Sequence, residues 1–145
     1  MSTIDQLSIF LENRAGRLAE VTHCLAEAGI NIRALSLADT SDFGILRLLV
    51  SDVDRAKTEL KQKGFTLGTN RVVAVQLDDQ PGGLDRVMQM LSKSNVNVEY
   101  MYDYMPRERQ ESGKTVIIFR FDKVDQAIEL LKANGMTIVG KEQIC

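Results

Sequence analysis

The chain has 145 residues, of which 44% are hydrophobic and 26% charged, a composition typical of a folded globular protein. Its formal net charge of -2 argues against general binding to nucleic acid or to an anionic membrane surface, because both favour an excess of basic residues. No apolar run approaches the roughly 20 residues of a membrane span, and no secretion signal opens the chain, so the cytoplasm is the expected location.

Strand-like and helix-like patterns alternate along the first half of the chain. Apolar runs rich in β-branched residues predict strands, and apolar residues at helical spacing predict helices. Both expected helices stop at a glycine, Gly29 and Gly64, a residue suited to a left-handed helix cap. The expected elements are a strand over 4–11, a helical stripe over 18–28, strands over 30–38 and 44–51, a helix over 53–63 and a short closing strand.

The second half of the chain follows the same order. Asn95 and Gly135 take the places of the two glycines that stop the helices. The expected elements are a strand over 72–77, a helical stripe over 84–91, strands over 96–105 and 115–122, a helix over 124–134 and a last short strand. The charged segment 106–114 is expected to be either a solvated loop or a contact with a partner.

The two halves also align residue by residue. Residues 7–18 align with 73–84, and Asn31-Ile32 aligns with Asn97-Val98. Beyond an insertion at 106–113 the alignment resumes. Because the repeat is longer than the 20–50 residues of a solenoid unit, it predicts two copies of one small domain, over 1–70 and 71–145. Each copy is expected to be a ferredoxin-like α+β domain of order β-α-β-β-α-β, with both helices on one face of a four-stranded antiparallel sheet.

The first strand of each copy leads into a helix through a turn that contains a glycine, at 13–16 and at 79–82. A helix N-terminus binds anions, and glycine lets a ligand approach the backbone. The carboxylate of a free amino acid would suit this turn, and its ammonium group would suit an Asn or Asp oxygen. The alternative is that these Asn and Asp residues are ordinary turn and cap residues.

An asparagine follows the first helix of each copy, at Asn31 and at Asn97. In the expected topology the first strand is central and the second strand lies at an edge. The glycine turn and this asparagine therefore need not share one pocket within a copy. They would meet if two copies dock edge to edge.

The residues Leu11-Glu12-Asn13-Arg14-Ala15-Gly16-Arg17-Leu18, followed by Ala28-Gly29-Ile30-Asn31-Ile32, resemble the ACT domain, a small-ligand regulatory module of amino-acid metabolism. They are especially similar to the serine-sensing domain of bacterial phosphoglycerate dehydrogenase. In that domain the turn asparagine and the asparagine that opens the second strand hold the effector, and Asn13 and Asn31 match these positions. A histidine that contacts serine there is replaced by Leu11.

The resemblance covers essentially the whole chain and implies two tandem ACT domains without a catalytic domain. It implies that ACT domains dock side by side through their second strands and bind a free L-amino acid at the interface. The two docked domains would belong to one chain or to two chains of a homodimer. A regulated metabolic enzyme is a possible partner. The implied ligand-binding residues are Asn13, Arg14, Ala15, Gly16, Leu18, Asn31 and Ile32 in the first copy, and Asp79, Gln80, Pro81, Gly82, Gly83, Leu84, Asn97 and Val98 in the second.

There are three alternatives to this function. A structural or protein-interaction module would need no ligand. An acylphosphatase-like enzyme would use arginines such as Arg14 and Arg17, but the second copy has Gln80 and Gly83 at these positions. An RNA-binding domain would need aromatic residues on its first and third strands. With one histidine and two cysteines without motif spacing, no metal site, cofactor or catalytic residue is expected.

Overall fold

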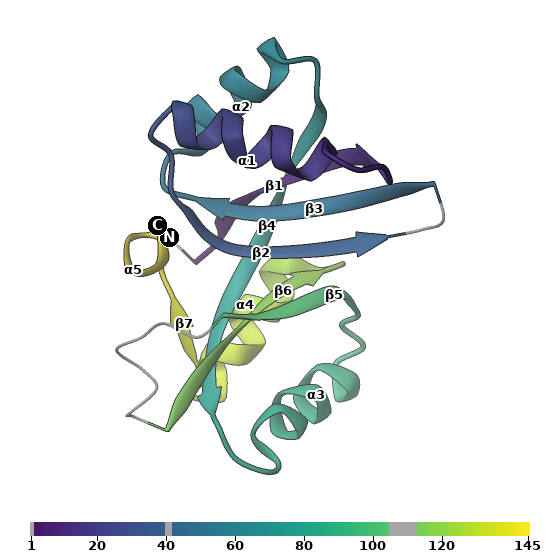
Figure 1. Ribbon diagram of the computed structural model, residues 1–145. Coiled ribbons are helices and arrows are strands. Elements are labelled where there is room, and N and C mark those ends of the chain that lie inside the picture. Colours follow the sequence, from purple (N-terminus) through teal and green to yellow (C-terminus); the bar gives the residue numbers. More distant parts are fainter. Residues whose placement is uncertain (1, 40–41, 105–112) are drawn as a thin grey trace. The chain divides into compact units, whose positions relative to one another are not determined.

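The computed structural model describes residues 2–39, 42–104 and 113–145. Of the charged segment 106–114, only Gly113 and Lys114 lie inside the described residues. The chain forms two compact units, whose elements are labelled in Figure 1. The first unit comprises Asp5–Asn70 together with Ile144–Cys145. The second unit comprises Arg71–Gln143 together with the segment that ends at Ile4.

The first unit has the strand order β2-β3-β1-β4, so that β1 is central and β2 lies at an edge. Its elements are β1 (Ile4–Glu12), α1 (Arg17–Glu27), β2 (Ile32–Asp39), β3 (Phe43–Val50), α2 (Val53–Gln62) and the beginning of β4 (Thr66–Asp78). β2 pairs with β3, and β3 pairs with β1, in antiparallel register. The predicted β-α-β-β-α-β order of this half is confirmed.

The second unit has the equivalent strand order β5-β6-β4-β7. Its elements are the end of β4, α3 (Gly83–Lys93), β5 (Val98–Tyr104), β6 (Lys114–Phe121), α4 (Val124–Ala133), β7 (Thr137–Val139) and the short α5 (Lys141–Ile144). The predicted element order is confirmed here as well, and α5 was not predicted. β4 runs without a break through the position at which the sequence places the domain boundary. There Asn70 lies within the strand, and its side-chain oxygen accepts a hydrogen bond from Ser8 Oγ (2.7 Å) on β1.

Each sheet packs its helices against one apolar face. Residues opposite each other in an antiparallel pair point to the same face, so that Ile9 and its partner Leu46 share the covered face of the first unit. The core of the first unit also contains Val21 and Leu25 from α1 and Leu60 from α2. Burial of each such side chain stabilises the fold by about 1.5–3 kcal/mol.

The core of the second unit is built in the same way and contains two stacked phenylalanine rings. Phe119 and Phe121 of β6 are fully buried, and their rings stack with centroids 5.2 Å apart. Val87 and Leu91 of α3 and Leu131 of α4 complete this core. None of the helices in the described part of the chain is long and apolar enough to cross a membrane.

Candidate functional site

A pocket of about 450 Å³ opens in the first unit where β1 leads into α1. Its volume is in the range of small-ligand pockets. Its walls include the predicted site residues Asn13, Arg14, Ala15, Gly16 and Leu18. They also include residues that the sequence did not single out as site residues, namely Leu11, Glu12, Leu37 and Gly44.

The backbone at Gly16 leaves the first turn of α1 open. Gly16 is the N-cap residue of α1 and has φ 90°, a left-handed conformation that favours glycine. No side chain of the described residues forms a capping hydrogen bond at this helix. The loop itself is held in place, because the Asn13 N–H donates to the carbonyl oxygen of Asp42 (2.9 Å). The Arg17 N–H donates to the Arg14 carbonyl oxygen (3.3 Å). The pocket therefore faces a helix N-terminus whose partial positive charge and other first-turn N–H groups favour an anion.

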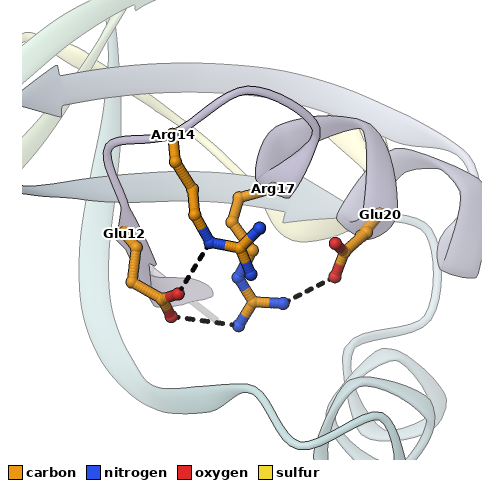
Figure 2. A network of polar contacts seen from close by, with 4 residues as sticks. All are labelled: Glu12, Arg14, Arg17 and Glu20. Atoms are coloured by element: carbon orange, nitrogen blue, oxygen red, sulfur yellow. Dashed lines mark hydrogen bonds and ion pairs between the residues drawn. The ribbon is translucent and has the colours of Figure 1, made fainter.

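A network of two arginines and two glutamates borders this turn (Figure 2). Arg14 Nε lies 3.1 Å from Glu12 Oε2, and the Arg14 side chain is 56% exposed. Arg17 bonds Glu12 (Nη2 to Oε1, 3.3 Å) and Glu20 (Nη1 to Oε2, 2.6 Å), and its Cζ lies 4.3 Å from the centroid of the Phe65 ring. The Arg17 side chain is only 14% exposed. Arg17 thus acts as a structural residue beneath the loop, whereas Arg14 stands at the surface.

The hydrogen bond from Arg14, together with the charges of Arg17 and Arg14, holds the pKa of the Glu12 carboxyl below its usual value, although partial desolvation opposes this shift. A carboxylate with a lowered pKa in the folded state stabilises the fold above its unfolded pKa and loses this contribution as the pH falls through the folded pKa. In the second unit, a hydrogen bond from Lys114 lowers the pKa of Asp78 in the same way.

We therefore expect the variant Glu12→Gln to be less stable than the unmodified protein at neutral pH. The difference in free energy of unfolding should shrink as the pH falls below about 4.5, the ordinary pKa of Glu12 in the unfolded chain, and through its lower pKa in the folded state. Urea unfolding at neutral pH and at several acid pH values measures this difference. A difference that stays constant over the whole pH range would contradict the role given to Glu12.

Asn31 and Ile32 lie at the far end of the first unit from this pocket. Ile32 pairs with Val50 at one end of β3, whereas the pocket lies at the Gly44 end. At about 3.4 Å per residue the two ends are roughly 20 Å apart. The Asn31 N–H donates to Ser51 Oγ (2.9 Å), and the Asn31 carbonyl oxygen accepts from the Ser51 N–H (2.9 Å). A single unit therefore does not bring Asn13 and Asn31 together.

The second unit repeats the loop but surrounds it differently. Gly82 is the N-cap of α3 with φ 88°, and the Asp79 N–H donates to the carbonyl oxygen of Gly113 (2.9 Å). Asp78 forms an ion pair with Lys114. These two residues line a smaller pocket, of about 150 Å³, together with Gly83.

The other predicted residues of the second unit are spread over different places. Asn97 and Val98 line a separate hollow beside α3, and the Asn97 N–H donates to Asp122 Oδ1 (2.9 Å). Leu84 packs against the core of the unit. Asp79, Gln80, Pro81 and Gly82 form the turn before α3. Asp79 and Asn97 are thus separated within their unit, as Asn13 and Asn31 are in theirs.

Two β-α-β-β-α-β units, each with a glycine-capped helix after its central strand, define a tandem ferredoxin-like α+β protein. The chain belongs to the ACT domain pair family, whose family model matches residues 2–145. The predicted resemblance to tandem ACT domains is confirmed.

Solved structures share this fold. The chain is similar to protein BT0572 from Bacteroides thetaiotaomicron, with 38% identity over 99% of this chain and 96% of that one and a TM-score of 0.91. The ligand-free regulatory subunit of aspartate kinase from Thermus thermophilus shares the fold, with 15% identity over 89% and 91% of the two chains and a TM-score of 0.63.

A third similar structure is E. coli aspartokinase III in complex with lysine and aspartate, with 17% identity over 90% of this chain and 31% of that one and a TM-score of 0.52. No curated protein matches the sequence.

Proposed function

We propose that the protein is a non-catalytic regulatory module that binds a free amino acid in the pocket of its first unit. The observation that carries this proposal is the pocket of about 450 Å³, in which a helix N-terminus without a side-chain cap meets the exposed Arg14 and several apolar side chains. The α-carboxylate of the ligand would accept hydrogen bonds from the first turn of α1 and from Arg14. The ammonium group would lie near the side-chain oxygen of Asn13.

Family and fold support this assignment. The chain is an ACT domain pair. Among proteins of the same fold, one is the regulatory subunit of an aspartate kinase and another is an aspartokinase in complex with lysine and aspartate. We propose that this protein likewise regulates an enzyme of amino-acid metabolism. Ligand binding would act on that enzyme by favouring one of two docked arrangements.

We further propose that a homodimer completes the site. β2 is an edge strand, and its residue Leu35, which does not line the pocket, exposes an apolar side chain. An exposed edge strand readily pairs with another strand. Antiparallel pairing of two β2 strands about a two-fold axis would place the start of one strand beside the end of the other. Asn31 of the partner subunit would then approach the pocket that contains Asn13.

Thermal unfolding in the presence of single free amino acids tests the binding. At a concentration about 100 times its Kd, a ligand stabilises the folded state by about 2.7 kcal/mol, which raises the midpoint by roughly 5–10 °C. We expect at least one amino acid at millimolar concentration to do so. If no amino acid raises the midpoint, the proposed function is wrong.

The variant Gly16→Ala is expected to abolish this rise, because a methyl group at the N-cap of α1 would stand where the ligand approaches the backbone. Its matched control is Gly82→Ala in the second unit. Gly82 has nearly the same φ as Gly16, 88° against 90°, so both variants carry the same backbone strain of about 1–2 kcal/mol. The control should keep the ligand-induced rise. Loss of the rise in both variants, or in neither, would argue against binding at Gly16.

A further inference from the structure

We infer that the ligand is an amino acid with an apolar side chain, and that each chain binds one such molecule, in its first unit only. This inference rests on the proposed function, because it takes the pocket of the first unit as the ligand site. Beyond that function, it specifies the side-chain chemistry that the site selects and the number of sites in each chain.

The pocket offers an apolar surface beyond the helix N-terminus. Leu11 is buried at its base, whereas Leu18 and Leu37 are 42% and 49% exposed. Exposed leucine side chains within a pocket favour a ligand that covers them, since removal of apolar surface from water drives association. A ligand anchored by its α-carboxylate at α1 would extend its side chain over this surface.

Among the side chains that the structure describes, Glu12 and Arg14 are the charged residues that line the pocket, and neither offers a new partner to a charged ligand side chain. The carboxylate of Glu12 is already bonded by both Arg14 and Arg17. Arg14 is the group that would meet the α-carboxylate. A lysine or aspartate side chain would therefore lose hydration without gaining a new ion pair, and this loss is costly.

Gly44 sets how closely Leu37 packs at the pocket. It lies opposite Leu11 in the pairing of β1 with β3. A Cβ atom at Gly44 would lie 3.3 Å from Leu37 Cδ1, which is tighter than ordinary van der Waals contact. A larger residue at position 44 would therefore displace Leu37 and narrow the pocket.

The second unit places different chemistry at the same positions of its sheet. Thr115 lies opposite Leu77 as Gly44 lies opposite Leu11, so a branched hydroxyl side chain takes the place of the glycine. Asp103 of β5 corresponds to Leu37 of β2. Asp103 lies opposite Ile117 of β6, as Leu37 lies opposite Leu46 of β3. The sheet beside the turn before α3 therefore carries a carboxylate at the position where the sheet beside the turn before α1 carries a leucine. The second unit does not suit the same ligand.

Titration calorimetry of the full chain measures both parts of the inference. Leucine, isoleucine, valine, methionine and phenylalanine are compared with alanine, serine, lysine and aspartate. We expect the apolar amino acids to bind with one molecule per chain, and alanine, serine, lysine and aspartate to bind at least tenfold more weakly than the best of them.

The variant Leu37→Asp introduces the residue type that the second unit has at the corresponding position, Asp103. It is expected to lower the affinity for apolar amino acids at least tenfold. Gly44→Thr should do the same by displacing Leu37 and narrowing the pocket. The matched control is Met101→Asp, because Met101 is an exposed apolar residue of the second edge strand and should leave the affinity unchanged. Circular dichroism and the unfolding midpoint of each variant check that it remains folded.

The outcomes separate this inference from the proposed function. Binding of a polar or charged amino acid with an affinity that Leu37→Asp leaves unchanged would overturn the inference and keep the proposed function. A stoichiometry of two molecules per chain would overturn the single-site part. Absence of binding by every amino acid tested would overturn both.

Discussion

The variant Gly83→Ala is expected to lower the free energy of unfolding by about 3 kcal/mol, the upper part of the usual range for overpacked sites. Gly83 is the first residue of α3, and its backbone passes close to the end of β4. A Cβ atom at Gly83 would lie far inside contact distance of the Asp78 carbonyl oxygen and 3.1 Å from the Asp78 carbonyl carbon. Because these are backbone atoms, the clash cannot be relieved by rotation of a side chain.

The measurement is the thermal midpoint of the variant, which should fall by roughly 10 °C. Gly68→Ala is the matched control. Gly68 lies in β4 without a positive φ, and a Cβ there would meet no atom of the described structure within 4 Å. The control should be within about 0.5 kcal/mol of the unmodified protein. Equal stability of both variants would show that α3 can move away from β4, against the close approach described here.

The variant Phe121→Ala is expected to destabilise the protein by about 3–5 kcal/mol, because it leaves a cavity in the core of the second unit. Phe121 is fully buried between the sheet and its helices and stacks on Phe119 with ring centroids 5.2 Å apart. Its counterpart in the repeat is the smaller Val50. The core of the second unit is therefore more dependent on aromatic volume than that of the first.

Urea unfolding measures the loss of free energy of unfolding in Phe121→Ala. Two further variants serve as comparisons. Phe121→Leu keeps most of the volume and should cost clearly less than Phe121→Ala. Phe10→Ala makes the same chemical change at a ring that is 53% exposed, and it should cost less than about 1 kcal/mol. If Phe121→Ala were no more destabilising than Phe10→Ala, Phe121 would not fill the core as described.

Most of the fold could be predicted because its signals are local. The end of α1 at Glu27 is followed by Gly29 with φ 71°, and the end of α3 at Lys93 by Asn95 with φ 57°, and both residues stand out in the sequence. The continuous β4 could not be predicted, because Asn70 is typical of a turn. Its actual partner, Ser8, is remote in the sequence.

The residues of the candidate site likewise divide into those that a local sequence signal predicts and those that depend on contacts remote in the sequence. The loop around Gly16 could be predicted, because a glycine between a strand pattern and a helix pattern is a local signal. The roles of Leu37 and Gly44 could not, because the residues of β2 and β3 that face the loop are set by strand register, which alternation alone leaves open. The position of Arg17 over Phe65 also depends on a contact between remote segments, although Arg17 and Glu20 have the spacing of a helical ion pair.

Amide chemical shifts of the ¹⁵N-labelled protein test ligand binding at α1 most directly. The protein is titrated with the amino acid that raises its unfolding midpoint most. We expect the largest shifts at Ala15, Gly16 and Leu18, which line the pocket, with much smaller shifts at Gly82 and Leu84 of the second unit. Shifts centred on Gly82 and Leu84, or no shift at saturating concentrations of any amino acid, would contradict the account.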